Sequence, residues 1–283
     1  MKAPKRIEPL IEDSLVDEVL SQLKSGKEAT VYVVRCGDQI CCAKVYKEAN
    51  KRGFRGHVRY QEGRKERNSR RARAMAKSSR YGREEQEEAW QNAEVDALYR
   101  LAAAGVRVPR PHLFSNGVLL MELVTDAHGN VAPRLDDIVL TEETARRYHR
   151  VLIDDVVRML GVGLIHGDLS EYNVLIDAHG PVIIDLPQAV DAAGNNSAGR
   201  MLIRDVDRLT TYFARYAPEL MITDYAHEIW SLYESGALTL QTQLTGQYQR
   251  VERPADVEGV LEGIKAAREE AMRRQQARAL EEL

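Results

Sequence analysis

Cysteine is scarce in this sequence, and the few cysteines lie close together. The 283 residues contain only Cys36, Cys41 and Cys42. Their spacing does not match a zinc-binding pattern, and their odd number argues against a disulfide framework. A reducing compartment, and therefore a cytoplasmic location, is the simplest expectation.

Long apolar runs are missing as well. No stretch approaches the ~20 apolar residues that a membrane helix needs, and the N-terminus, MKAPKRIEPLIEDSL, lacks the uninterrupted apolar segment of a secretory signal. The sequence also has no internal repeat and no Pro- or Ser-rich linker. With 44% hydrophobic and 29% charged residues, the composition is that of a soluble globular protein, and no membrane partner is expected.

The stretch Leu164–Pro187, LIHGDLSEYNVLIDAHGPVIIDLP, carries the strongest functional signal. It places His166, Asp168, Asn173 and Asp185 in a fixed order. Phosphoryl transfer from ATP needs one carboxylate that orients or deprotonates the acceptor hydroxyl. It also needs an amide oxygen and a second carboxylate that hold Mg²⁺ on the triphosphate. HGD alone would fit an ordinary polar loop, but the combined pattern favours a kinase-type fold.

Two short strands are predicted inside the same stretch. The hydrophobic runs Val174–Ile176 and Val182–Ile184 are separated by the turn residues Ala-His-Gly-Pro. A tight hairpin of this kind would hold Asn173 and Asp185 close together at one end. The spacing therefore predicts a single metal site formed by these two residues.

The N-terminal half is predicted to contain a helix and then a β-hairpin. Apolar residues recur at helical spacing over Ile7–Leu23, and the β-rich runs Val31–Cys36 and Ile40–Tyr46 follow. Lys44 lies inside the second strand, where a lysine costs stability unless it is paired. It is either an edge residue that reaches water or the lysine that contacts the phosphates of ATP and pairs with a helix glutamate.

A glutamate that could pair with Lys44 lies on the next predicted helix, Glu84–Ala104. Glu94 lies next to the apolar face of this helix, where a buried charge requires a partner. Other acidic residues on the helix compete for this role: Glu87, Glu88 and Asp96. After the helix, Asn116-Gly117 predicts a hairpin between His112–Ser115 and Val118–Val124. Further helices are predicted after the capping residue Thr141, over Arg200–Tyr216 and over Met221–Gly236.

The segment Lys47–Arg83 departs from the rest of the sequence in charge. It contains fourteen Lys or Arg and three Glu, a net charge of +11, whereas the whole chain carries −3. A solvated insertion between strand and helix is the more common outcome for such a composition. The alternative is a basic arm that binds RNA or another polyanion. Serines in these basic surroundings are candidate phosphorylation sites: Ser69, Ser78 and Ser79.

Seven short motifs follow one another along the chain: SGKEATVY at 25–32, AKVYK at 43–47, MELV at 121–124, APRL at 132–135, HGDLSEYN at 166–173, IIDLPQAV at 183–190 and RDV at 204–206. Taken in this order, they resemble the RIO atypical protein kinases, most closely their first subfamily. The resemblance covers roughly residues 20 to 215 and is specific. As in that family, only Gly26 occupies the loop where ordinary kinases carry G-x-G-x-x-G. No Asp-Phe-Gly or Ala-Pro-Glu motif follows Asp185, so the platform on which ordinary kinases bind a peptide substrate is absent.

The resemblance implies roles for individual residues. Asp168 would be the catalytic carboxylate, and Asn173 and Asp185 would bind Mg²⁺, for which Mn²⁺ is a possible substitute. Asp185 could also accept the phosphoryl group as an aspartyl phosphate. Lys44, supported by Glu94, would bind the phosphates of ATP. The remaining nucleotide-binding residues implied are Ser25 and Lys27 over the triphosphate, Met121 as the gatekeeper, and Glu122 and Val124 with backbone groups toward adenine.

The expected fold is α/β (α+β): a bilobal protein-kinase-like fold with a small antiparallel β-rich N-lobe and a mainly helical C-lobe, truncated relative to ordinary protein kinases. The expected parts are an N-terminal helical extension (1–23), the N-lobe (24–124, with a basic flexible loop at 47–83), the C-lobe with the catalytic loop (125–220) and C-terminal helices (221–283).

The expected function is ATP- and Mg²⁺-dependent transfer to serine or threonine of an unknown protein, self-phosphorylation included, or an ATPase switch. Two alternatives remain. HGDL also occurs in small-molecule kinases of the aminoglycoside phosphotransferase type, which would show an acidic acceptor pocket beyond Asp168. A ribosome- or RNA-binding factor using residues 47–83, with a ribosomal precursor as partner, is the other.

Overall fold

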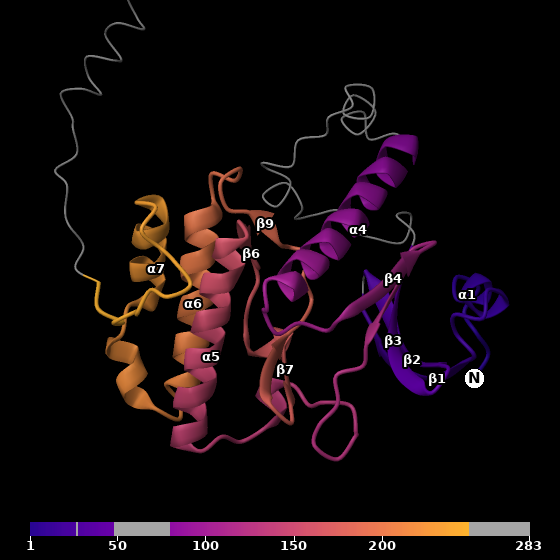
Figure 1. The fold of residues 1–283 in the computed structure, drawn as a ribbon, viewed down its shortest axis with the longest axis horizontal. Helices are drawn as coiled ribbons and strands as arrows, with labels where there is room; N and C mark the ends of the chain where they lie inside the picture. The colour runs from indigo at the N-terminus through magenta and orange to yellow at the C-terminus, as the bar shows by residue number, and fades with distance from the viewer. Residues whose placement is uncertain (27, 48–79, 249–283) are drawn as a thin grey trace, which may run out of the picture. The chain divides into compact units, whose positions relative to one another are not determined.

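A computed structural model describes residues 1–26, 28–47 and 80–248 of the chain. These residues form an α+β fold in which an antiparallel sheet is followed by a mainly helical part (Figure 1). In Figure 1 the sheet and α1 lie to the right, helices α5 to α7 lie to the left, and short strands lie between them. The expected fold class is therefore confirmed. Most of the basic segment 47–83 and all of residues 249–283 lie outside the described residues.

The N-lobe is built on one five-stranded antiparallel sheet with the order β1-β2-β3-β5-β4. Its strands are β1 (Glu18–Ser25), β2 (Ala29–Cys36), β3 (Gln39–Tyr46), β4 (Pro111–Ser115) and β5 (Val118–Glu122). Helix α4 (Arg80–Ala103) connects β3 to β4. Asn116 and Gly117 both have positive φ, 51° and 71°, as a two-residue hairpin turn requires. The two predicted hairpins of this lobe are thus confirmed.

The prediction of an N-terminal helix over Ile7–Leu23 is wrong beyond its first turns. Helix α1 covers only Glu8–Glu12, and Ser14 adopts a φ of 56°, which a right-handed helix cannot contain. The chain then turns into β1, which pairs with β2. The apolar spacing over this stretch rested on few positions, and pairing with the free edge of β2 outweighed it. Residues from Glu18 onward therefore belong to the N-lobe sheet.

Side chains along β3 alternate between the two faces of the N-lobe sheet. Cys41, Ala43 and Val45 pack on one face of the sheet in a cluster that also contains Ile7 and Leu10 around α1. Because successive residues of a strand point to opposite faces, Lys44 and Tyr46 point to the other face. Tyr46 belongs to the larger core cluster, which includes Leu98 and Leu101 of α4. The strand register therefore directs Lys44 toward α4.

The C-lobe is organised around helices α5 (Glu142–Gly161), α6 (Ala198–Phe213) and α7 (Tyr225–Glu234). Thr141 caps α5 as predicted, because its hydroxyl accepts a hydrogen bond from Thr144 N at 3.2 Å. The helices pack through fully buried residues, among them Leu152, Leu209 and Phe213. Short elements complete the lobe: β6 (Leu164–Ile165), β7 (Val174–Asp177), β8 (Gly180–Ile183), β9 (Val190–Asp191) and the 3₁₀ turns η2 (Leu135–Asp137), η3 (Glu171–Asn173) and η4 (Pro218–Ile222).

The three cysteines are free thiols in the β2–β3 hairpin. Burial raises the pKa of Cys42 to about 12, so its thiol is protonated near neutral pH. In the described part of the chain, no helix has both the length and the apolar character that crossing a membrane requires.

Buried His149 makes the stability of the C-lobe depend on pH. Its Nε2 lies 2.9 Å from Thr210 Oγ1, and its ring packs edge-on against Phe213. Burial, followed by the charge of Arg150, lowers the pKa of His149 from 6.5 to about 4. The unfolded chain therefore binds more protons between these values, so the stabilisation present above pH 6.5 is lost as the pH falls toward 4.

We expect the native protein to lose about 3 kcal/mol of unfolding free energy through this residue between pH 7 and pH 4. Urea unfolding of the native protein and of His149→Gln at pH 4.5, 5.5, 6.5 and 7.5 measures this contribution, since glutamine does not titrate. The variant should be less stable at pH 7.5 but should show a flatter pH dependence. Parallel curves for the two proteins would contradict the assignment.

Candidate active site

Lys44 connects the two lobes at the centre of the candidate site. Its Nζ lies 2.5 Å from Glu94 Oε1 on α4 and 3.2 Å from Asp185 Oδ1, which follows β8 in the C-lobe. Tyr46 OH donates a 2.6 Å hydrogen bond to Glu94 Oε2. The predicted Lys44–Glu94 pair is confirmed.

The charges of Lys44 and Asp185 stabilise each other. Burial lowers the pKa of Lys44, but the charges of Glu94 and Asp185 and their hydrogen bonds outweigh burial, so the pKa lies above its ordinary value. Burial raises the pKa of Asp185, yet Lys44, with smaller contributions from His166 and Lys24, brings it below its ordinary value. Lys44 is therefore a cation and Asp185 an anion over the physiological range.

The β7–β8 hairpin brings Asn173 and Asp185 to the same end of one element. Val174 pairs with Ile183, and Ile184 N donates to Asn173 O at 2.9 Å. At the opposite end, Asp177 closes the turn by accepting hydrogen bonds from His179 N and Gly180 N at 2.7 and 2.9 Å. The predicted hairpin and the convergence of its ends are confirmed.

Asp185 has a left-handed backbone, with a φ of 68°. Such a conformation is uncommon outside glycine, although Asp and Asn tolerate it better than other residues. Residues held in this region cluster at functional sites. Here the conformation brings the Asp185 carboxylate to Lys44 of the N-lobe.

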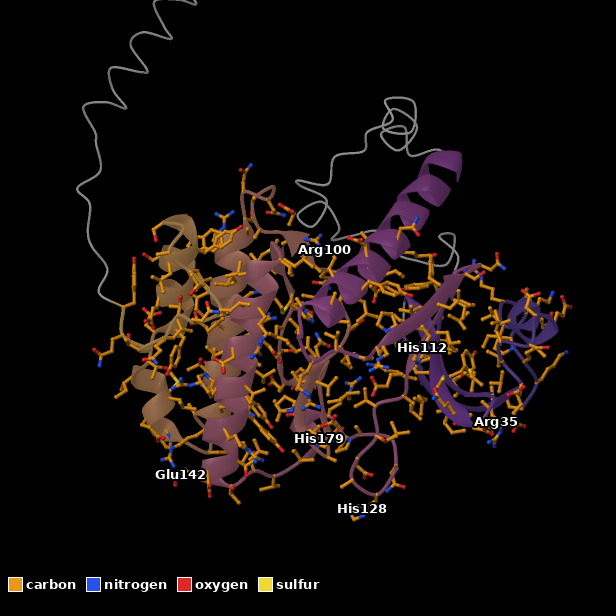
Figure 2. All side chains as sticks on the ribbon, in the orientation of Figure 1. Arg35, Arg100, His112, His128, Glu142 and His179 are labelled. Carbon is orange, nitrogen blue, oxygen red and sulfur yellow. The ribbon has the colours of Figure 1, made fainter. Side chains whose placement is uncertain are left out.

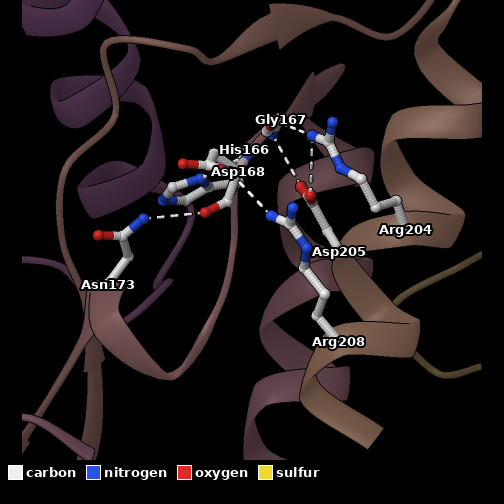
Figure 3. Close-up of polar contacts among 7 residues, drawn as sticks. All are labelled: His166, Gly167, Asp168, Asn173, Arg204, Asp205 and Arg208. Carbon is white, nitrogen blue, oxygen red and sulfur yellow. Dashed lines mark hydrogen bonds and ion pairs between the residues drawn. The ribbon is translucent and has the colours of Figure 1, made fainter. Parts of the chain in front are cut away.

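The loop after β6 carries His166 and Asp168 and is held at both ends. Strand β6 pairs with β9, which fixes the beginning of the loop. His166 is 2% exposed; its Nε2 lies 3.1 Å from Ile184 O, and its Nδ1 accepts a 3.3 Å hydrogen bond from Asp168 N (Figure 3). Because Nδ1 accepts the Asp168 N–H, Nε2 is the ring nitrogen that donates to Ile184 O. His166 therefore positions Asp168 from within the core.

Residues of helix α6 hold the same loop through hydrogen bonds to Gly167. Gly167 N donates a 2.8 Å hydrogen bond to Asp205 Oδ2, and Arg204 donates to Gly167 O. Asp205 is buried, and burial raises its pKa, partly offset by His166 and Arg204. The Arg204-Asp205 pair thus clamps the backbone of Gly167, which has a φ of 80° that side-chain-bearing residues rarely adopt.

Asp168 makes a contact that the sequence does not suggest. We predict from the sequence that this carboxylate is free of protein salt bridges, so that it can meet a substrate hydroxyl. That prediction is wrong: Arg208 Nη1 lies 2.8 Å from Asp168 Oδ1 (Figure 3). Both side chains are nevertheless well exposed, 44% for Arg208 and 40% for Asp168.

The residues predicted to bind a divalent cation are suited to one. Asn173 Nδ2 donates to Asp168 O at 2.9 Å, which leaves the amide oxygen of Asn173 as its acceptor. Asp185 supplies an ionised carboxylate at the same hairpin end. Within the described ranges, no three His, Cys, Asp or Glu side chains gather to hold a metal by themselves. One carboxylate, one amide and substrate phosphates are a typical environment for Mg²⁺.

The structure gives the contacts of most of the remaining predicted nucleotide-binding residues. Ser25 ends β1, and its hydroxyl accepts a 3.1 Å hydrogen bond from Lys47 Nζ. Lys27 lies outside the described residues. The gatekeeper candidate Met121 pairs with Cys42 in the sheet and packs on the main core. The linker candidates are Glu122, whose N–H donates to Arg110 O at 2.8 Å, and Val124, whose carbonyl accepts from Ala132 N at 3.0 Å. Their roles toward a nucleotide stay predictions.

A groove of about 830 Å³ opens beside Asp168, between η3 and α6. Asp168 and Asn173 are among the residues that line it. The arginines that line it are Arg200, Arg204, Arg208 and Arg215. The acidic pocket expected of an aminoglycoside-type enzyme is not what this groove presents.

Three residues of the site do not stand out in the sequence. Tyr46, next but one to Lys44, is detectable only as a same-face neighbour on the strand. Asp205 lies in the Arg-Asp-Val motif, which signals importance but not its contact with Gly167. Arg208 has no local signal, because it lies 40 residues from Asp168 in the chain.

Comparison with known proteins decides the family. Residues 30–226 match the model of the RIO domain. The chain belongs to the RIO family. The Lys44–Glu94 pair, the HGD loop and the β7–β8 hairpin are therefore parts of a RIO domain, and the resemblance drawn from the sequence motifs is confirmed.

Curated relatives of this RIO domain carry kinase names. The chain is 33% identical over 207 residues to the RIO-type serine/threonine-protein kinase Rio1 of Haloferax volcanii, covering 73% of this chain and 67% of that protein. It is 31% identical over 199 residues to the Rio1 protein of Methanocaldococcus jannaschii, covering 70% and 63%. It is 29% identical to the serine/threonine-protein kinase rio1 of Schizosaccharomyces pombe, covering 73% of this chain but only 40% of that protein. Among solved structures, a crystallised kinase domain is 12% identical with a TM-score of 0.46, covering 72% and 65%.

Glu94 is only 4% exposed. Replacing its partner Lys44 should therefore affect the stability of the protein as well as its activity. We expect Lys44→Met to lower the unfolding free energy by about 3 kcal/mol, because the charge of Glu94 is left buried without its cation, with the hydroxyl of Tyr46 still donating to it. The double variant Lys44→Met, Glu94→Gln should recover most of this stability. Neither variant should transfer phosphate, because the cation for the nucleotide is missing. Urea unfolding measures the stability and [γ-³²P]ATP turnover measures the activity. If the double variant recovered activity together with stability, Lys44 would have only a structural role.

Proposed function

We propose that this RIO domain is an ATP- and Mg²⁺-dependent serine/threonine protein kinase that also phosphorylates itself. The observation that carries the proposal is the position of Lys44, bound to both Glu94 and Asp185 at 2.5 and 3.2 Å. This arrangement brings one cation from the N-lobe sheet next to one ionised carboxylate that follows β8 in the C-lobe. A nucleotide triphosphate is the ligand that needs both.

Each residue then has a defined task in the transfer. Lys44 neutralises the phosphates while Glu94 keeps its ammonium oriented. Asn173 and Asp185 would hold Mg²⁺, which when bound supplies charge neutralisation at the triphosphate. Asp168 accepts a hydrogen bond from the acceptor hydroxyl and takes its proton as the oxygen attacks. His166, Asp205 and Arg204 keep the loop in place, so that Asp168 needs little rearrangement during the reaction.

The proposal favours a protein acceptor over a small cationic molecule. An aminoglycoside-type acceptor is polycationic, and the groove beside Asp168 carries arginine at four positions. Like charges facing each other in a groove oppose binding. The relatives' names as serine/threonine-protein kinases support the same choice. We also propose a cytoplasmic setting, on the basis of the three free thiols.

One experiment tests the proposal and separates its two modes. The purified chain is incubated with [γ-³²P]ATP and Mg²⁺, and the products are divided into acid-stable phosphoserine or phosphothreonine, hydroxylamine-labile aspartyl phosphate and free phosphate. Label in the acid-stable fraction supports the kinase. Label in the hydroxylamine-labile fraction together with released phosphate supports an ATPase switch through Asp185 instead. No ATP consumption with Mg²⁺ or Mn²⁺ contradicts both.

Binding of RNA or a ribosomal precursor is a second proposed function, and it rests on the net +11 of Lys47–Arg83. We expect deletion of residues 51–80 to weaken binding to a single-stranded RNA while leaving ATP affinity unchanged. The native affinity should fall steeply between 50 and 200 mM salt, because each neutralised phosphate releases a counterion. Filter binding at several salt concentrations measures this slope. A flat slope would leave an autoregulatory segment as the better explanation.

A further inference from the structure

Helix α6 presents a charged stripe to the groove beside Asp168. The residues of this stripe recur every three or four positions, so they share one face of the helix. They are Arg200, Ile203, Arg204, Asp207, Arg208 and Thr211, and Arg215 follows just after the helix end. The opposite face of α6 is buried in the core, where Met201, Leu202 and Leu209 lie. The core therefore fixes the direction in which the arginines point.

The arginines of the stripe have different binding partners. Arg204 binds the catalytic loop through Gly167 O. Arg200 is exposed and donates to Ser197 Oγ at 2.9 Å. Arg215 is exposed and lies over the ring of Tyr212, 5.3 Å from its centroid. Arg208 alone of these four is paired with the catalytic carboxylate. Arg200, Arg208 and Arg215 thus reach the groove with guanidinium groups that are open to solvent.

The Arg208–Asp168 ion pair occupies an atom that the proposed reaction uses. An acceptor hydroxyl must come within hydrogen-bonding distance of Asp168, and Arg208 already lies 2.8 Å from Oδ1. An exposed ion pair of this kind contributes about 0.2–1 kcal/mol, so a competing carboxylate can displace it at little cost. A guanidinium offers five N–H donors and binds a carboxylate bidentately. A ligand that brings its own carboxylate would therefore release Asp168.

We propose that the α6 groove binds an acidic segment of the protein acceptor and that Arg208 is the specificity-determining residue. This inference rests on the proposed kinase function and names its substrate class: serine or threonine with acidic neighbours. A carboxylate next to the acceptor hydroxyl pairs with Arg208, and Asp168 becomes available to that hydroxyl. Further acidic residues along the segment pair with Arg200 or Arg215. A neutral acceptor leaves Arg208 paired with Asp168 and is phosphorylated slowly.

The dimensions and the mixed charge of the groove favour a peptide over RNA. Residues four apart on α6 are about 6 Å apart along the helix, which matches the spacing of alternate residues in an extended peptide, about 6.6 Å. The groove also contains Glu171 and Asp207. These carboxylates oppose a continuous phosphate backbone but can accept hydrogen bonds from peptide N–H groups. The charge pattern is thus complementary to an acidic peptide that still carries free backbone donors.

Two fluorescein-labelled peptides test the proposal. Both contain one serine, which is flanked by aspartates in the first and by asparagines in the second. Their kcat/KM values with ATP and Mg²⁺ are compared, and their binding is followed by fluorescence anisotropy with a non-hydrolysable ATP analogue. We expect at least a tenfold preference for the aspartate peptide, roughly the value of one charge-assisted bidentate pair. Arg208→Ala should reduce this preference to about twofold, because the aspartate peptide loses its partner and becomes slower while the asparagine peptide gains free access to Asp168 and becomes faster. Arg208→Lys should restore part of the preference.

Arg35→Ala is the matched control. Arg35 is also exposed and also paired with one carboxylate, that of Glu18 at 2.9 Å. Figure 2 places it in the N-terminal sheet, on the opposite side of the described chain from α6. The peptide preference and the ATP affinity of this variant should equal those of the native protein.

Several outcomes would overturn the inference. Equal kcat/KM for the two peptides, or a preference unchanged in Arg208→Ala, removes Arg208 as a specificity residue. A weaker ATP affinity in Arg208→Ala with unchanged peptide preference makes it a phosphate-binding residue instead. An RNA oligonucleotide that binds more tightly than the aspartate peptide, and loses affinity in Arg200→Ala and Arg215→Ala, assigns the groove to nucleic acid. Failure of the kinase proposal is separate: it appears as no ATP consumption, while anisotropy still reports whether the acidic peptide binds.

Discussion

Replacing Asp185 by asparagine should lower the turnover number by about 10³-fold. The carboxylate of Asp185 is ionised, lies 3.2 Å from Lys44 Nζ and emerges at the same hairpin end as Asn173. Asparagine tolerates the left-handed backbone at this position, so the substitution removes the charge without adding strain. The loss should fall on the metal-dependent step, because the divalent cation loses its only anionic protein ligand among the residues proposed to bind it.

The measurement combines turnover with metal titration. ATP binding without Mg²⁺ should change less than threefold in Asp185→Asn, whereas the Mg²⁺ dependence of turnover should shift to much higher concentration or disappear. Asp191→Asn is a suitable control. Asp191 lies on β9 and accepts hydrogen bonds from Ala193 N and Gly194 N, at 3.0 and 2.6 Å, which an amide oxygen can also accept. Native-like turnover in Asp185→Asn would exclude it as a metal ligand.

Replacing Asp168 by asparagine should reduce phosphotransfer by about 10²- to 10⁴-fold, the range that a positioned general base contributes. Asparagine keeps the shape of the side chain and still accepts a hydrogen bond from Arg208, but it cannot take the hydroxyl proton. ATP affinity should be almost unchanged, because Lys44, Asn173 and Asp185 remain in place. Stability should change little, because the ion pair with Arg208 is exposed on both sides.

Single-turnover kinetics with bound ATP separate the chemical step from nucleotide binding in this variant. A rise in KM for ATP with an unchanged kcat would contradict the assignment of Asp168 to the chemical step. If self-phosphorylation persists in Asp168→Asn as hydroxylamine-labile label, direct attack by Asp185 on the nucleotide becomes the better account. Acid-stable label at the native rate would place the catalytic carboxylate elsewhere.

Local patterns in the sequence were sufficient for the parts of the site that are close together in the chain. The β7–β8 hairpin follows from two hydrophobic runs and a turn, so the approach of Asn173 and Asp185 could be predicted from spacing alone. The alternation of β3 placed Lys44 on one face, and the position of Glu94 beside the apolar face of α4 selected it from four acidic candidates. In each case a short-range rule, period two or period 3.6, determines the direction of the side chain.

The N-terminal segment shows where such rules fail. Four apolar residues at helical spacing over Ile7–Leu23 suggested a helix, but β1 forms there because β2 offers an unpaired edge. Strand pairing depends on a partner elsewhere in the chain, and a period read from one segment contains no information about that partner. Ile7 and Leu10 then pack in the core cluster around α1.

The sequence by itself determined the family, the hairpins and the identity of the residues that face the cleft, because motifs and periodicity are local. Only the tertiary structure decided that Arg208 binds Asp168, that Asp205 and Arg204 hold Gly167, and that the groove beside the site is lined by arginines. These contacts join α6 to a loop about 40 residues earlier in the chain. They exist because the buried face of α6 packs in the core, and that packing sets where its charged face points.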